Sequence, residues 1–112
     1  MSINEFLDFH KVISGDEYPY RELAPRVKCA DGLAFSAQVS YSHYCTPRQN
    51  DAGVYWAIEI GYPSQRVEEF MPYAEDELNP TNTVYGYVPV TVVDAVIEKH
   101  GGIVSKFAPA LQ

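Results

Sequence analysis

Long apolar runs, paired cysteines and export signals are scarce in this 112-residue chain, and each scarcity excludes a class of protein. No apolar run approaches the roughly 20 residues that span a bilayer, so we expect no membrane segment. The N-terminus has no basic cluster ahead of an apolar stretch, so it does not read as a secretory signal, and we expect a cytoplasmic protein. Cys29 and Cys45 are the only cysteines, and in a reducing compartment we expect two free thiols.

Basic residues are also few, because 8 Lys and Arg oppose 15 Asp and Glu, giving a formal charge of −7. The imbalance is greatest after residue 66, where the acids outnumber only two bases, Lys99 and Lys106. A negative field repels phosphate, so we expect no direct nucleic-acid binding. An acidic face suits a basic protein surface, or serves solubility alone.

Motifs that carry chemistry are nearly absent: there is no phosphate loop, dinucleotide fingerprint, serine nucleophile elbow or paired zincin histidines. The strongest cluster is His43 with Cys45. In an extended segment, these two side chains would point to the same side. Such a pair can form a thiolate nucleophile or half of a zinc site, with Cys29 and either His10 or His100 as further ligands. No C-x-x-C spacing supports zinc, so we predict no metal, no cofactor and no catalytic residue, with a metal-binding or thiol-dependent site as the alternative.

The apolar content, 46% of residues, is enough for one modest core, and we predict a single domain over residues 1–112. Ser2 and Glu5 form the S-x-x-E capping box, which satisfies free backbone amides at a helix start. An apolar stripe at helical spacing continues from Ile3 to Ile13. Gly15 then indicates the end of this first helix.

Two strands are predicted over 26–30 and 33–44, joined at Asp31 and Gly32, a pair that favours a type I′ turn. In the second strand, Phe35 begins an alternation of apolar and polar residues that ends at Tyr41, which indicates one buried face.

A third strand is predicted over 54–62, with Val54, Trp56, Ile58 and Ile60 on one face. A short helix over 65–71 follows, with Ser64 as its N-cap. The fourth strand covers 83–88, where Gly86 indicates a bulge or a close approach of backbone.

The last helix is predicted over 91–100, started by the T-x-x-D pattern of Thr91 and Asp94 and ended by Gly101. The order helix-strand-strand-strand-helix-strand-helix predicts an α+β fold. We expect a three- to four-stranded, mainly antiparallel sheet with helices on one face.

Two surface features stay unexplained by folding requirements: an acidic run within 68–77 and nine tyrosines against a single tryptophan. Tyrosine gives large contact area at low entropic cost and is enriched at interfaces. The alternatives are a solvated acidic face and tyrosines that cap a thin core. We predict a partner-binding surface made of Glu68, Glu69, Tyr73, Glu75, Asp76, Glu77, Tyr85 and Tyr87.

Three stretches resemble small acidic proteins encoded in bacteriophage and prophage genomes: Cys45-Thr46-Pro47-Arg48, the segment Thr83-Val84-Tyr85-Gly86-Tyr87-Val88-Pro89, and Glu98-Lys99-His100-Gly101-Gly102. The resemblance covers most of the chain and implies a protein made in the bacterial cytoplasm, with no activity or catalytic residues to carry over. Proteins of this kind often bind host or phage proteins, including defence nucleases. We therefore hypothesise a non-enzymatic binding protein with a protein partner or with self-association. The alternatives are a small enzyme or metal-binding module centred on His43 and Cys45, and a structural virion or assembly component.

Overall fold

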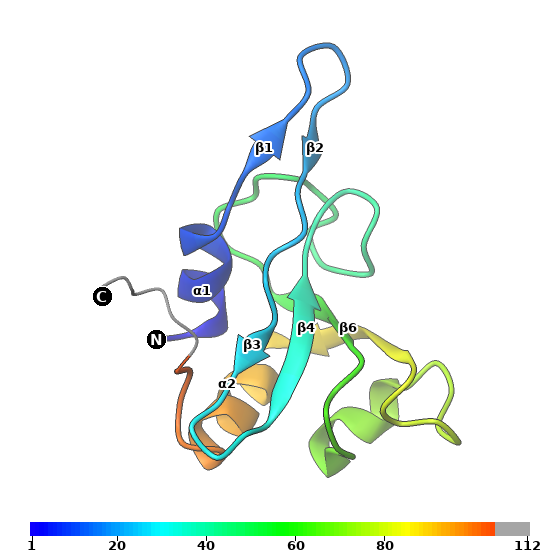
Figure 1. Cartoon of the computed structure of the whole chain (residues 1–112). Coiled ribbons are helices and arrows are strands. Elements are labelled where there is room, and N and C mark those ends of the chain that lie inside the picture. The colour runs from blue at the N-terminus through cyan, green and yellow to red at the C-terminus, as the bar shows by residue number, and fades with distance from the viewer. Residues whose placement is uncertain (105–112) are drawn as a thin grey trace.

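A four-stranded antiparallel sheet forms the centre of the computed structural model, which describes residues 1–104 (Figure 1). Its strand order follows the sequence: β3 (Val27–Lys28), β4 (Ala34–Gln38), β5 (Ala57–Gly61) and β6 (Val84–Pro89). The helical elements are α1 (Ile3–Phe9), the 3-10 helix η1 (Glu68–Tyr73) and α2 (Val90–Lys99). A separate hairpin, β1 (Ile13–Ser14) with β2 (Tyr20–Arg21), projects away from the rest of the molecule (Figure 1).

The predicted α+β class and order of elements are confirmed, and the hairpin β1–β2 is an addition to that order. The core lies between the sheet and the helices, where Phe35, Ile58 and Ile60 of the strands and Phe6 and Val93 of the helices are fully buried. Burial of such side chains contributes about 1.5–3 kcal/mol each.

The capping box at the start of α1 is confirmed: Ser2 Oγ accepts from Glu5 N at 3.1 Å and Glu5 Oε1 accepts from Ser2 N at 2.7 Å. The predicted continuation of this helix to Ile13 is wrong. The Arg21 guanidinium donates to the Leu7 carbonyl at the end of α1, and Ile13 pairs with Arg21 in the hairpin instead. A long-range partner therefore satisfies the helix end.

The connection between β3 and β4 is not the predicted type I′ turn, which needs two consecutive positive φ angles. Only Gly32 has one, at +102°, whereas Asp31 does not. Gly32 N donates to Cys29 O at 3.0 Å, and Cys29 N donates to Leu33 O at 2.8 Å. This is a type I turn followed by a left-handed glycine, the geometry of a three-residue hairpin loop.

Both long central strands are shorter than predicted. β4 ends at Gln38 rather than at Tyr44, and β5 begins at Ala57 rather than at Val54. Tyr41, which the alternation placed on the buried face of its strand, is exposed, and Trp56, which was grouped on one face with Ile58 and Ile60, is 70% exposed. The chain between these strands turns away from the sheet, so the period of two stops with the pairing.

Three residues that were predicted to start helices, Ser64, Thr91 and Asp94, do not have that role in the structure. η1 is a 3-10 helix, and Ser64 does not cap it, because its Oγ accepts from Ala34 N at 2.9 Å. Thr91 does not cap α2, whose N-cap is Pro89. Asp94 Oδ1 instead accepts from Ile3 N at 2.8 Å, so it supports the start of α1 from the neighbouring helix.

Within residues 1–104, no helix has the length and apolarity needed to cross a membrane.

The bulge predicted at Gly86 is confirmed, whereas the group that approaches this glycine closely is the Tyr44 side chain rather than backbone. Ile58 faces Val88 and Ile60 faces Tyr85, so two residues of β6, Gly86 and Tyr87, lie opposite one residue of β5 in a β-bulge. A Cβ atom at Gly86 would also lie only 3.2 Å from the Tyr44 Cβ atom. The bulge reverses the alternation of β6 at this point.

Candidate functional site

The acids of η1 are already paired with bases. Glu68 forms an ion pair with Arg66, and this guanidinium lowers the pKa of the Glu68 carboxyl. Glu69 Oε2 lies 3.1 Å from Lys99 Nζ of α2. These exposed pairs add little stability, but they neutralise part of the charge that the sequence placed on this helix.

The loop after η1 is held by Asp76. Its Oδ1 accepts from Leu78 N at 3.0 Å, which forms an Asx turn, and its Oδ2 accepts from Asn79 Nδ2 at 2.8 Å. Asp76 N donates to Thr83 Oγ1 at 3.1 Å, and Glu75 N donates to Val84 O at 2.9 Å. The loop is therefore tied to the start of β6 by its backbone, and Asp76 serves as its organiser.

Glu75, Glu77 and Leu78 lie at the surface of this loop, and we call the residues 75–78 the acidic loop. Among the described residues, neither Glu75 nor Glu77 forms an ion pair. Leu78 is 85% exposed between these charges. The acidic loop thus combines two carboxylates that form no ion pair with an exposed apolar side chain, on a backbone held by hydrogen bonds.

The three predicted tyrosines have different environments. Tyr85 is 0% exposed, and its hydroxyl donates to Pro80 O, so it belongs to the core and its place in a contact surface was wrong. Tyr73 is half-buried and packs against the core. Tyr87 is 46% exposed and faces Tyr44 rather than the core.

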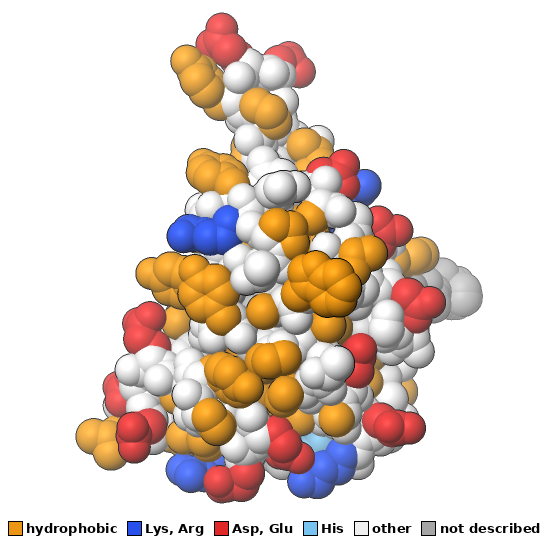
Figure 2. All heavy atoms as spheres, turned by 180° about the vertical axis from the view of Figure 1, so that it is seen from behind, with side chains coloured by type: hydrophobic (Ala, Val, Ile, Leu, Met, Phe, Trp, Pro, Cys, Tyr) orange, Lys and Arg blue, Asp and Glu red, His pale blue; other side chains and the backbone are white. Residues whose placement is uncertain are grey.

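The sequence predicted Tyr87 as a contact residue but not its stacking on the exposed Tyr44, and we call Tyr44 and Tyr87 the aromatic surface. The Tyr44 and Tyr87 rings are stacked, with centroids 5.9 Å apart and planes at 29°. The Arg48 guanidinium lies 5.6 Å from the Tyr44 ring centroid. Hydrophobic side chains gather across the middle of the face seen in Figure 2, with acidic side chains spaced around its edge. The tyrosine excess and the bulge signal at Gly86 were the clues in the sequence.

His43 and Cys45 lie in a turn after β4, not in a strand, and both contact Ser40. The Cys45 thiol donates to Ser40 O at 3.2 Å, and His43 Nδ1 lies 2.6 Å from Ser40 Oγ. Burial raises the pKa of the Cys45 thiol and lowers the pKa of His43. Over residues 1–104, no three His, Cys, Asp or Glu side chains are grouped to hold a metal ion. The arrangement holds a neutral thiol inside the protein, which is unsuited to nucleophilic attack.

Cys29 and Cys45 are both buried and free, so we expect slow alkylation in the native state. The rate with iodoacetamide should be lower by on the order of 100-fold than in the urea-unfolded chain, because a buried protonated thiol reacts only after opening. Peptide mass spectrometry assigns the labelled cysteine. Native labelling of Cys45 as fast as that of an unfolded thiol would favour the thiol-dependent alternative.

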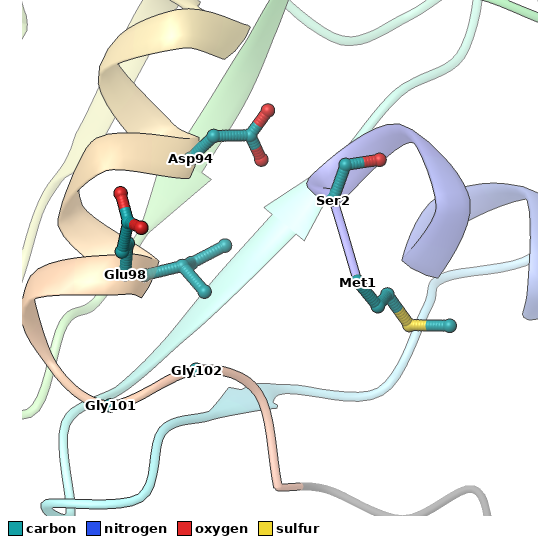
Figure 3. Close-up of a pocket in the computed structure, with 7 residues that line it drawn as sticks. Met1, Ser2, Asp94, Glu98, Gly101 and Gly102 are labelled. Carbon is teal, nitrogen blue, oxygen red and sulfur yellow. The ribbon is translucent and has the colours of Figure 1, made fainter.

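An open hollow of about 590 Å³ lies between the start of α1 and the end of α2, lined by Met1, Ser2, Asp94, Ile97, Glu98, Gly101 and Gly102. Asp94 and Glu98 of α2 lie across from Met1 and Ser2 (Figure 3). The Asp94 carboxylate accepts a hydrogen bond from Ile3 N, so its role is structural.

Comparison of the chain with protein-family models, with curated proteins and with solved structures found no match.

Proposed function

We propose that this chain is a non-enzymatic binding protein that contacts a basic surface of a protein partner through its acidic loop. One observation carries the proposal: the acidic loop presents the unpaired carboxylates of Glu75 and Glu77 beside the exposed Leu78, on a backbone fixed by Asp76. Protein contact sites combine an apolar core with a polar rim, and Leu78 beside two carboxylates offers both on a small scale. The resemblance to phage and prophage proteins adds a setting, the bacterial cytoplasm, in which inhibition of a host defence protein is one role.

Several basic side chains are paired away from the acidic loop, although the Glu68 carboxylate and, more weakly, that of Glu77 raise the pKa of the Arg66 guanidinium. Lys11 pairs with Asp51 at 2.9 Å, and Arg66 and Lys99 pair with the acids of η1. Arg21 is buried and bonds to backbone carbonyls. The negative field of the acidic loop therefore steers association with a basic partner and sets its salt dependence.

Charge reversal in the acidic loop tests this function. We expect Glu75→Lys with Glu77→Lys to reduce capture of a basic partner from bacterial lysate by about tenfold or more, because two attractive contacts become repulsive. Immobilised wild-type protein and mass spectrometry identify the partner, and binding of that purified partner is then measured. Asp76 is left unchanged because it holds the loop.

The matched control reverses two acids elsewhere. Asp16→Lys with Glu17→Lys makes the same change in net charge at exposed positions between β1 and β2. We expect this variant to retain most of the binding, and both variants to keep the wild-type circular dichroism spectrum. Equal losses from the two double variants would show attraction to net charge alone and would contradict a site at the acidic loop.

A further inference from the structure

The hollow between the start of α1 and the end of α2 lies beside the point at which the described part of the chain ends. Gly102 lines the hollow and lies at its lower edge in Figure 3. The Gly102 carbonyl accepts from Ala30 N at 3.0 Å, and Val104 N donates to Lys28 O at 2.7 Å. The backbone is therefore held against β3 and its turn up to residue 104, and residues 105–112 begin three residues after Gly102.

The lining of the hollow combines negative charge with apolar surface. Asp94 and Glu98 lie one turn apart on α2 and face the start of α1 across the hollow (Figure 3). Asp94 already accepts a hydrogen bond from Ile3 N, whereas Glu98 forms no ion pair within the described part of the chain. Negative partial charge at the end of a helix adds to that of Glu98. Ile97 and Met1 also line the hollow, so it suits a segment that brings one cation and apolar side chains.

The segment that follows Val104 has this composition. It reads Ser-Lys-Phe-Ala-Pro-Ala-Leu-Gln, in which Lys106 is the only charged side chain and Phe107 and Leu111 are large and apolar. Lys106 comes two residues after Val104, an extended reach of about 7 Å, and eight extended residues reach about 26–29 Å. The hollow has a volume of about 590 Å³, within the range of cavities that enclose a small ligand, so it has room for side chains of such a segment.

Charge and position along the chain select the base that faces the hollow. Only two bases follow residue 66, and one of them, Lys99, already pairs with Glu69 of η1, with 3.1 Å between Nζ and Oε2. We propose that residues 105–112 close the hollow and that the Lys106 ammonium pairs with the Glu98 carboxylate. An exposed ion pair contributes little stability by itself, so it sets the position of the segment while apolar contacts hold it. This inference does not depend on the acidic loop, and its failure would leave the proposed function unaffected.

Carbodiimide coupling tests the pairing directly, because it joins an amine to a neighbouring carboxylate through an amide bond with loss of water. We expect a Lys106–Glu98 crosslink, identified by peptide mass spectrometry, in a yield about tenfold or more above that of Lys106 with a carboxylate outside the hollow, such as Asp31. A tethered segment that did not bind would meet the surrounding carboxylates at comparable effective concentrations, so the selectivity is the readout. The Lys11–Asp51 pair, with 2.9 Å between its charged atoms, is the internal positive control.

Removal of the apolar side chains tests closure of the hollow separately from the ion pair. Phe107→Ser with Leu111→Ser is expected to lower the yield of the Lys106–Glu98 crosslink by about tenfold. Leu23, which is 70% exposed, supplies the control Leu23→Ser, with no expected change. Circular dichroism confirms that the variants keep the fold. Full retention of the crosslink by Phe107→Ser with Leu111→Ser would show an ion pair without closure and would overturn the proposal.

Isotope mixing distinguishes this segment from a second copy as the occupant. Equal amounts of isotope-labelled and unlabelled protein are coupled together, and an intramolecular crosslink joins only peptides of the same label. A Lys106–Glu98 crosslink between labelled and unlabelled peptides would indicate a second copy in the hollow and would overturn the proposal. The same conclusion would follow if Lys106 coupled equally to Asp31 and Glu98, or did not couple at all while the Lys11–Asp51 control formed.

Discussion

Replacing Tyr85 by alanine is expected to lower the free energy of unfolding by about 3–5 kcal/mol, the range for loss of a large buried aromatic side chain. Tyr85 is 0% exposed on β6, and its ring centroid lies 6.0 Å from that of Phe70. Its hydroxyl donates to Pro80 O in the segment after the acidic loop. Urea denaturation followed by circular dichroism measures the loss, and the cavity beneath this segment should also loosen the acidic loop.

Tyr85→Phe separates packing from hydrogen bonding. It keeps the ring and removes only the bond to Pro80 O, so we expect a cost of about 1 kcal/mol. Partner binding by this variant should be close to that of the wild type, because Tyr85 touches no solvent. A Tyr85→Ala protein that is as stable as the wild type yet fails to bind would contradict burial and restore Tyr85 to the contact surface.

The opposite environments of Tyr85 and Tyr87 show where sequence reasoning stopped. A period of two places these residues on the same face of a strand. The bulge inserts one residue, so Tyr85 and Val88 point into the core and Tyr87 points out. Gly86 predicted an irregularity, but only the paired strand β5 determines which residues the bulge includes.

Local signals were reliable where their partners are local. The capping box of Ser2 and Glu5 forms as predicted, because both bonds join residues three apart. Ser64 and Asp94 also belong to predicted capping patterns, yet their oxygens accept from Ala34 and Ile3 across the fold. Such competition is decided by tertiary contacts, which a single sequence does not display.

The residues of the candidate site also divide into those that local sequence predicts and those that depend on tertiary contacts. The exposed acids could be predicted from composition, whereas their ion pairs with distant bases such as Lys99 could not. The stack of Tyr44 on Tyr87 joins two segments that only the bulge and the turn after β4 bring together. A functional surface assembled from separate loops is therefore visible as a tyrosine excess but not as a motif.

Replacing Arg21 by methionine is expected to cost about 2–4 kcal/mol of stability, because two backbone carbonyls lose a charged donor and one of them is buried. Arg21 Nη2 donates to Leu7 O at 2.6 Å, and Nη1 donates to Asn50 O at 2.8 Å. The guanidinium also lies 5.9 Å from the Tyr55 ring centroid. Denaturation midpoints measure the loss, and Arg21→Lys should recover only part of it, since one ammonium cannot reproduce the planar fork.

The same variant tests whether net charge or local charge governs binding. Arg21→Met makes the chain more negative by one unit, but it removes a cation that is buried and that the acidic loop does not contact. Partner binding per folded molecule should therefore stay within about twofold of the wild type, whereas reversal of Glu75 and Glu77 reduces it by about tenfold or more. Tighter binding by folded Arg21→Met than by the wild type would contradict a site at the acidic loop, because attraction would then follow the total charge of the chain.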